Sequence, residues 1–249
     1  MKIRKAVASV MIGMLGIMPL AASAKTYNVG STPTGMPFTY LDANTNTIEG
    51  IMVDLINVIG KDLDFEPKIT PLSFSTLISA LQTKRIDIIS AAMIKTEERE
   101  KVVAFSEPLL SYGEGVVVKN DNNTPYKNFN DMKGMTVAIQ LGTAYVEPAR
   151  ASGAFKDIKL YDSSADMLRD LKNGRVDAVL LDYPIAKRTL QQPAFEGMQI
   201  VESYQPVIVR DVGLVVRKDD TQLLEQLNQS ISKLKQEGVI KNVLQKWGL

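Results

Sequence analysis

The chain has 249 residues, a formal net charge of +1, and neither cysteine nor histidine. These absences exclude a disulfide framework, a thiol nucleophile, a Ser-His-Asp triad and metal sites built on Cys or His. The near-neutral charge and the lack of a basic run also argue against nucleic-acid binding. We therefore expect no cofactor, no metal and no nucleic-acid partner.

The N-terminus has the pattern of a secretory signal peptide. Basic residues at positions 2, 4 and 5 precede an apolar run over residues 6–22, which ends in the small-residue sequence ASA before Lys25. We expect cleavage after Ala24, which leaves 249 − 24 = 225 residues with a net charge of 1 − 3 = −2. An uncleaved anchor is less favoured, because no basic stop-transfer segment follows the apolar run.

The next part of the chain alternates between strand and helix patterns. Strands are predicted at residues 26–31, 66–71 and 86–90, and helices at 51–63 and 75–82. Such alternation favours a parallel sheet with crossover helices.

A short helix is predicted after Thr96, whose side chain can cap it, with Glu97 and Glu98 in the first turn. Arg99 would then occupy the third helical position, where a cation opposes the helix dipole by roughly 0.3 to 1 kcal/mol. A cation at this position requires another stabilising partner.

The remaining elements continue the alternation. Strands are predicted at 135–140, 158–161 and 178–181, and helices at 145–150, 164–171, 222–235 and 239–246. The last two helices would close the fold at its C-terminal end.

An internal repeat indicates two similar units. The segment LQTKRIDII, residues 81–89, is echoed by LKNGRVDAV, residues 171–179, and GVVVK at 115–119 is paralleled by GLVVR at 213–217. We interpret the second pair as two strands that cross between two α/β lobes, one lobe being inserted into the other. Lobe 1 would comprise residues 25–115 and 213–249, and lobe 2 residues 116–212. Two linkers would restrict lobe motion to opening and closing.

The carboxyl ends of the strands locate the expected binding cleft, because ligands of open α/β sheets bind there. Arg99 follows the strand at 86–90, and Asp182 follows the equivalent strand at 178–181. Two facing lobes would bring this cation and this anion to one cleft.

At these residues the chain resembles the family-three periplasmic amino-acid-binding proteins of ABC importers, which include glutamine, histidine and lysine/arginine/ornithine binders. The resemblance covers essentially the whole mature chain, and its marks occur in the family's order: Pro37-Phe38, Gly50 to Leu55, Phe74, Ala80-Leu81-Gln82, Asp87 to Arg99, Phe105-Ser106, Asp131 to Gly134, Gly142-Thr143, Arg175 to Asp182 and Lys246-Trp247. It implies a two-lobed periplasmic-binding-protein (Venus-flytrap) fold of type II with two hinge strands, and no enzymatic activity.

The resemblance also implies a set of ligand-binding residues. Arg99 would bind the ligand's α-carboxylate, Asp182 its α-ammonium, and Phe74 would pack against it. The remaining predicted positions are Thr32, Ala92, Ile94, Gln140, Thr143, Ala144 and Tyr145. The alternatives are an exposed Arg99 paired with Glu98 or Glu100, an Asp182 that only caps the following turn, and a Phe74 that belongs to the core.

Several positions depart from the family's pattern and bear on the ligand. Ile94 stands where Thr, Ser or Asp is usual, which removes a side-chain oxygen from the ligand's charged end, and Thr32 and Gly35 replace a frequent acid and a frequent aromatic residue. Tyr145 would reach into the space for the ligand's side chain. Without an acid near Thr32 a basic ligand would bury an unpaired charge, so a small or neutral amino acid is expected.

The resemblance implies a periplasmic monomer that delivers its ligand to an inner-membrane ABC permease. An alternative is a lyase on the same scaffold, similar to the cyclohexadienyl dehydratases, with Glu114 or Glu147 as the proton donor. A receptor sensor domain is disfavoured because the sequence ends at Leu249 with no membrane segment after it.

Overall fold

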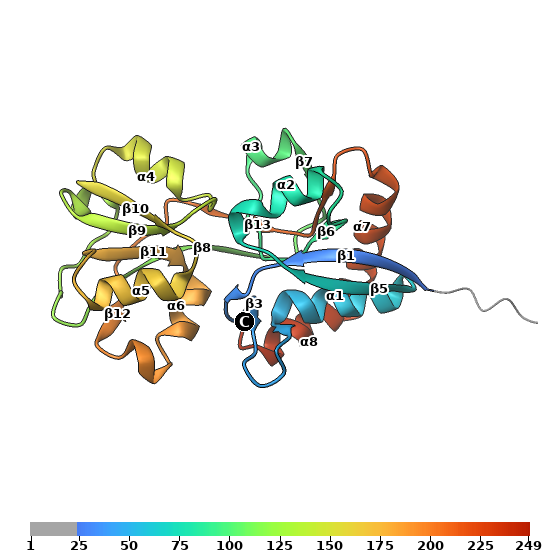
Figure 1. The fold of residues 1–249 in the computed structure, drawn as a ribbon, viewed down its shortest axis with the longest axis horizontal. Helices are drawn as coiled ribbons and strands as arrows, with labels where there is room; N and C mark the ends of the chain where they lie inside the picture. The colour runs from blue at the N-terminus through green and yellow to red at the C-terminus, as the bar shows by residue number, and fades with distance from the viewer. Residues whose placement is uncertain (1–23) are drawn as a thin grey trace, which may run out of the picture.

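The computed structural model describes residues 24–249 and has two lobes, each built on its own β-sheet (Figure 1). The signal-peptide prediction falls on residues 1–24 and so lies, except for Ala24, outside the described residues. Within residues 24–249, no helix is both long and apolar enough to cross a membrane.

Lobe 1 contains a five-stranded sheet in the order β5-β1-β6-β14-β7. Its strands are β1 (Lys25–Ser31), β5 (Phe65–Pro71), β6 (Ile88–Ile89), β7 (Val103–Phe105) and β14 (Val215–Arg217). Strand β1 is parallel to β5 and β6, whereas β14 is antiparallel to β6 and β7. A small antiparallel sheet of β2 (Thr34–Gly35), β3 (Thr39–Leu41) and β4 (Ile48–Glu49) lies beside it.

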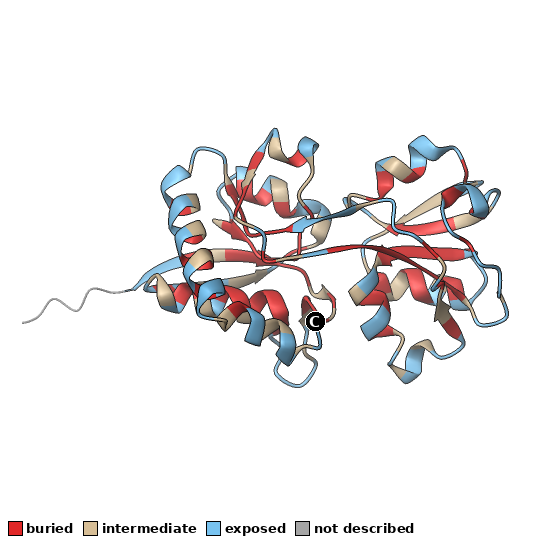
Figure 2. Ribbon diagram, turned by 180° about the vertical axis from the view of Figure 1, so that it is seen from behind, coloured by how far each residue is buried: buried red, intermediate tan, exposed pale blue. Residues whose placement is uncertain are grey.

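Helices cover both faces of this sheet (Figure 1). One face packs against α1 (Ile51–Asp62), α7 (Thr221–Gln236) and α8 (Val239–Lys246), and the other against α2 (Leu77–Gln82). The buried residues of Figure 2 follow the strands and the inner helix faces. The helix predicted at 75–82 is divided into a 3-10 turn at Phe74–Thr76 and α2, and the strand predicted at 86–90 is confined to β6.

Lobe 2 contains a second sheet in the order β10-β9-β11-β8-β12. Its strands are β8 (Leu110–Lys119), β9 (Thr136–Gln140), β10 (Asp157–Tyr161), β11 (Ala178–Asp182) and β12 (Met198–Ile200), and its helices are α4 (Val146–Ser152), α5 (Ser164–Lys172) and α6 (Tyr183–Thr189). Short 3-10 turns occur at Phe129–Met132 and Pro193–Phe195. Strands β10, β9 and β11 are parallel, and β8 runs antiparallel to β11 and β12.

The internal repeat is confirmed by equivalent hydrogen bonds in the two lobes. The Asp87 carboxylate accepts from the backbone N–H of Asn28 at 3.0 Å, and the Asp177 carboxylate accepts from that of Thr136 at 2.8 Å. In each case the backbone N–H of the aspartate also donates to the carbonyl of the same strand residue. The aspartate therefore aligns the start of a buried strand with its parallel neighbour, β1 for β6 in lobe 1 and β9 for β11 in lobe 2.

The strands that connect the lobes differ in position from the prediction. Residues 110–113 of β8 pair with β13 (Val209–Val212), and β8 runs from one lobe into the other (Figure 1). The predicted segments 115–119 and 213–217 lie instead mostly in the sheets, because their valines are fully buried in the two cores. The division of the chain at residues 115 and 213 stays a prediction.

Gly50, immediately before α1, allows the loop that carries Phe38 to approach the helix. The carbonyls of Pro37 and Phe38 accept from the N–H groups of Ile51 and Met52 at 2.9 and 3.0 Å, which satisfies two free donors of the helix. Gly50 has a φ of 129°, and a Cβ there would lie 2.3 Å from the Phe38 carbonyl oxygen. Only glycine fits this contact.

We predict that Gly50→Ala lowers the free energy of unfolding by about 2 to 4 kcal/mol, since it combines a disfavoured φ with a backbone clash. Gly153→Ala is the matched control: Gly153 has a φ of 59°, but no atom lies within 4 Å of the position that a methyl group would take there. It should cost only about 1 kcal/mol. Urea unfolding measures both, and equal losses would contradict the role given to the close contact.

Candidate ligand-binding site between the lobes

A small cavity of about 20 Å³ lies between the two lobes, beyond the carboxyl ends of β1, β6, β9 and β11. Its walls come from both lobes, and it has room for little more than a water molecule. All ten residues predicted from the sequence line it: Thr32, Phe74, Ala92, Ile94, Arg99, Gln140, Thr143, Ala144, Tyr145 and Asp182. Their contact with a ligand stays a prediction.

Arg99 extends from the short helix α3 (Glu97–Glu100) of lobe 1 into this cavity. Thr96 caps the helix as predicted, with its hydroxyl accepting from the Arg99 N–H at 3.3 Å. The Arg99 residue is only 8% exposed. Its guanidinium donates from Nη1 to the Ile94 carbonyl and from Nη2 to the Gly142 carbonyl at 2.8 Å. Because Gly142 follows β9, the second bond joins the lobes.

The alternative of a surface Arg99 is wrong. Glu100 forms its ion pair with Lys95, at 2.8 Å, and Arg99 is buried. Burial lowers the pKa of Arg99, but an arginine guanidinium keeps its proton at neutral pH. A buried, permanently charged group is therefore available for an anionic ligand.

Phe74 covers one side of the guanidinium. The Arg99 Cζ atom lies 5.5 Å from the centroid of the Phe74 ring, within the range of a cation–π interaction. Phe74 also packs against the apolar cluster of α2, so it serves the core as well as the cavity wall. Phe74 thus lines the cavity and packs on the core, and its contact with a ligand stays a prediction.

Asp182 ends β11 in lobe 2, and two tyrosine hydroxyls fix its carboxyl group inside the cavity. Tyr145 donates to its Oδ1 at 2.5 Å, and the Tyr112 hydroxyl lies 3.0 Å from its Oδ2. Its carboxylate makes no capping bond to helix α6, which contradicts the alternative of a simple turn cap. Tyr145 lines the cavity, and its hydroxyl bonds to Asp182. Its reach into the space of the ligand's side chain stays a prediction.

Tyr112, Phe38 and Thr39 also line the cavity, although the sequence did not predict them there. Tyr112 lies on β8, and its ring stacks on that of Phe38 with centroids 5.0 Å apart. Thr39 shares a hydrogen bond of 2.7 Å with Thr32. Phe38 belongs to the Pro37-Phe38 mark of the family, but that mark assigned it no place in the cavity. Thr39 and Tyr112 belong to no motif named above.

The two charges of the cavity are not paired with each other. None of the ion pairs formed within residues 24–249 joins Arg99 to Asp182. Desolvation raises the pKa of Asp182 to about 6, and the bonds from Tyr145 and Tyr112 and the charge of Arg99 oppose this rise. The described residues also contain no cluster of acidic side chains that could hold a metal ion. The arrangement suits a ligand with a negative and a positive group.

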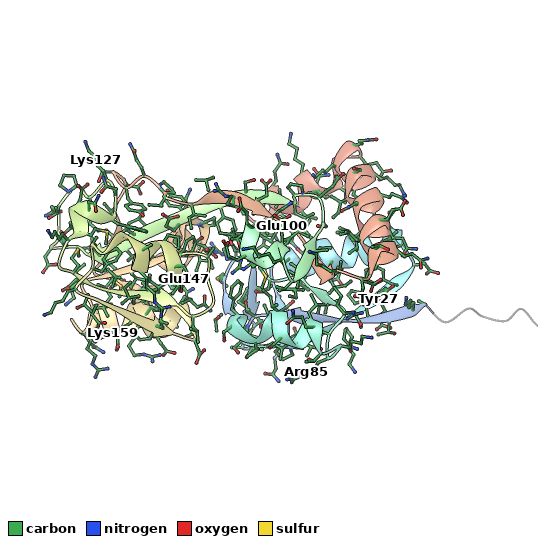
Figure 3. All side chains as sticks on the ribbon, turned by 90° about the horizontal axis from the view of Figure 1, so that it is seen from above. Tyr27, Arg85, Glu100, Lys127, Glu147 and Lys159 are labelled. Carbon is green, nitrogen blue, oxygen red and sulfur yellow. The ribbon has the colours of Figure 1, made fainter. Side chains whose placement is uncertain are left out.

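The two acids weighed as proton donors lie outside the cavity. Glu114 is buried, but its carboxylate accepts from the Tyr204 hydroxyl at 2.9 Å and from the N–H of Ile208 at 3.0 Å. The Glu147 side chain is 79% exposed and pairs with Arg150 on lobe 2 (Figure 3). Neither is positioned to protonate a molecule held between the lobes.

Comparison with known proteins defines the class of the molecule. The model of the bacterial extracellular solute-binding proteins, family 3, matches residues 27–249. The chain belongs to this family, and its two-lobed fold is of the periplasmic-binding type II.

Relatives at moderate identity are binding proteins. The ABC transporter arginine-binding protein 1 of Escherichia coli K12 is 30% identical, over 91% of this chain and 92% of its own length. The L-cystine-binding protein TcyJ of the same organism is 28% identical, over 93% and 86%. The structure of an ancestral arginine-binding protein bound to arginine is 33% identical, with a TM-score of 0.83 over 91% of this chain and all of that one.

The raised pKa of Asp182 predicts a pH-dependent stability. Its value of about 6 exceeds the ordinary 3.8, so the folded state binds the proton more tightly. The stability from this group is fully present below about pH 4 and is lost as the pH rises through 6. At about 1.4 kcal/mol per pKa unit, the loss amounts to at most about 3 kcal/mol.

Urea unfolding of the free protein and of Asp182→Asn between pH 4 and 7.5 measures this contribution. We expect the difference between the two free energies of unfolding to change by up to about 3 kcal/mol, with the wild type losing relative stability toward pH 7.5. The same pH profile in both proteins would show that Asp182 does not titrate in this range.

Proposed function

We propose that this protein binds a free amino acid between its lobes and delivers it to the permease of an ABC importer in the inner membrane. It would act as a periplasmic monomer after removal of residues 1–24. One observation carries the proposal: a buried cation and a desolvated carboxylate, contributed by opposite lobes, face one cavity without pairing with each other.

The charges match the two ends of an amino acid. A zwitterion that enters a closed site loses the water around both charges, and each must be paired or the cost reaches several kcal/mol. Arg99 would take the α-carboxylate, replacing the carbonyls that it now contacts, and Asp182 the α-ammonium. Micromolar affinity requires about 8 kcal/mol, which two paired charges and the contact with Phe74 can supply after ordering costs.

Lobe closure would couple binding to transport. The ligand would first dock on lobe 1 at Phe74 and Arg99, and closure would add Asp182 and the loop after β9. The bond from Arg99 to the Gly142 carbonyl marks where the lobes meet around the guanidinium. A permease can then distinguish the closed from the open shape.

The ligand is proposed to be a neutral amino acid. Arg99 and Asp182 are the only charged residues that line the cavity within the described chain, and the other polar side chains there are uncharged: Thr32, Thr34, Thr39, Tyr112, Gln140, Thr143 and Tyr145. Arginine would bury its guanidinium without a second acid to pair with it. Some relatives are named for arginine binding. For this reason we do not propose arginine as the ligand of this chain.

We predict that Arg99→Met abolishes calorimetrically measurable binding of the amino acid, because the α-carboxylate loses the cation that Arg99 contributes to the cavity wall. Arg150→Met is the control, as Arg150 pairs with the exposed Glu147 away from the cavity. It should bind with wild-type affinity. Retained binding by Arg99→Met would assign the guanidinium a purely structural role.

Calorimetric titration with the common amino acids tests the ligand class. We expect the tightest binding from a neutral amino acid, and at least tenfold weaker binding of arginine and lysine, whose side-chain charge stays unpaired. Tight binding of arginine alone would refute the neutral assignment while leaving the amino-acid site intact. Turnover of prephenate or arogenate would instead establish the lyase alternative.

A further inference from the structure

Tyr112 occupies a special place in the site, because it belongs to the strand that joins the lobes. In β8 it is opposite Arg210 of β13, within the paired segment that crosses between the sheets. Its side chain is buried and stacked on Phe38. The hydroxyl lies 2.7 Å from the Ala92 carbonyl oxygen and 3.0 Å from Asp182 Oδ2. A single atom thus contacts an acceptor of each lobe.

This hydroxyl has one hydrogen for two acceptors. A phenol donates one hydrogen bond and can accept others. It can donate to the Ala92 carbonyl or to the Asp182 carboxylate. In either case the lone pairs of the phenol oxygen remain able to accept a hydrogen bond from a further donor.

An α-ammonium group would bring hydrogens that this phenol oxygen can accept. Its three N–H groups lose their water on burial, and each then requires an acceptor. Asp182 offers one and the Ala92 carbonyl another, while Ile94 contributes no side-chain oxygen to the same cavity. Ala92 has a φ of 52°, an uncommon conformation for alanine of the kind that clusters at ligand sites.

Building on the proposed function, we propose that Tyr112 is a further ligand-binding residue whose phenol oxygen accepts a hydrogen bond from the ligand's α-ammonium. Together with Asp182 and the Ala92 carbonyl it forms a three-acceptor subsite. The site then selects α-amino acids over the same carboxylic acids without the amino group.

The surroundings of Tyr112 hold its hydroxyl oxygen in a fixed position, where it can accept a hydrogen bond from a ligand. The stacked ring and the paired β8 backbone fix the hydroxyl, so a ligand meets it and does not displace it. Burial and the neighbouring Asp182 raise the pKa of Tyr112 well above its ordinary value, and the group therefore remains a neutral phenol at physiological pH. A neutral oxygen accepts from an ammonium group without adding a second negative charge.

The test compares an amino acid with its desamino acid on Tyr112→Phe, which keeps the ring and removes the hydroxyl. The probe is the neutral amino acid that binds the wild type most tightly by calorimetry, paired with its desamino acid: propanoate for L-alanine, 4-methylpentanoate for L-leucine, 4-carbamoylbutanoate for L-glutamine. Weakly binding acids are measured by displacement of the amino acid. We expect a loss of tenfold or more for the amino acid and less than threefold for the desamino acid.

The control is Tyr126→Phe, since the Tyr126 hydroxyl bonds to Asn122 in lobe 2, away from the cavity. It should change neither affinity. If Tyr112→Phe does not fold, Tyr112→Leu carries the same comparison. An equal loss for both probes, or none for the amino acid, overturns the role of Tyr112 and leaves the proposed function standing. No binding of any neutral amino acid to the wild type overturns both.

Discussion

The structure depends on keeping a buried guanidinium and a desolvated carboxylate apart in one cavity. Arg99 and Asp182 are each satisfied by neutral partners, backbone carbonyls for the cation and phenol hydroxyls for the anion. A direct ion pair between Arg99 and Asp182 would leave neither charge available to a ligand. Neutral hydrogen bonds compensate less of the desolvation than an opposite charge does, so the cavity favours a partner that carries both charges.

The scaffold maintains this separation through the strands that join the lobes. Arg99 lies between β6 and β7 along the chain of lobe 1, Asp182 ends β11 on lobe 2, and Tyr112 lies between them on β8. Since β8 pairs with β11 in one lobe and with β13 between the lobes, a change in lobe angle would alter the contacts of the Tyr112 hydroxyl. The strand that joins the lobes therefore also carries a side chain that lines the cavity.

The hydrogen-bond donors differ between the two buried acids. Glu114 and Asp182 are both withdrawn from water, but Glu114 receives two backbone N–H groups and the Tyr204 hydroxyl, whereas Asp182 receives only tyrosine hydroxyls. The desolvation of Asp182 raises its pKa, and a raised pKa in a cavity marks a carboxyl group as a candidate functional residue.

The sequence by itself determined the two-lobed fold, the repeat and many of the residues that line the cavity. Periodicity placed α1, α5, α7 and α8 to within one residue, and the shared Asp in residues 81–89 and 171–179 identified equivalent strands, because these signals are local. The capping residue Thr96 and the position of Arg99 were likewise readable from neighbours in the chain. Only the tertiary structure decided the contacts between distant segments. These are the pairing of residues 110–113 with 209–212, the bond from Tyr145 to Asp182, and the presence of Tyr112 in the cavity. These contacts depend on how the sheets of the two lobes are placed relative to each other. A local sequence pattern does not specify which side chains then meet between the lobes.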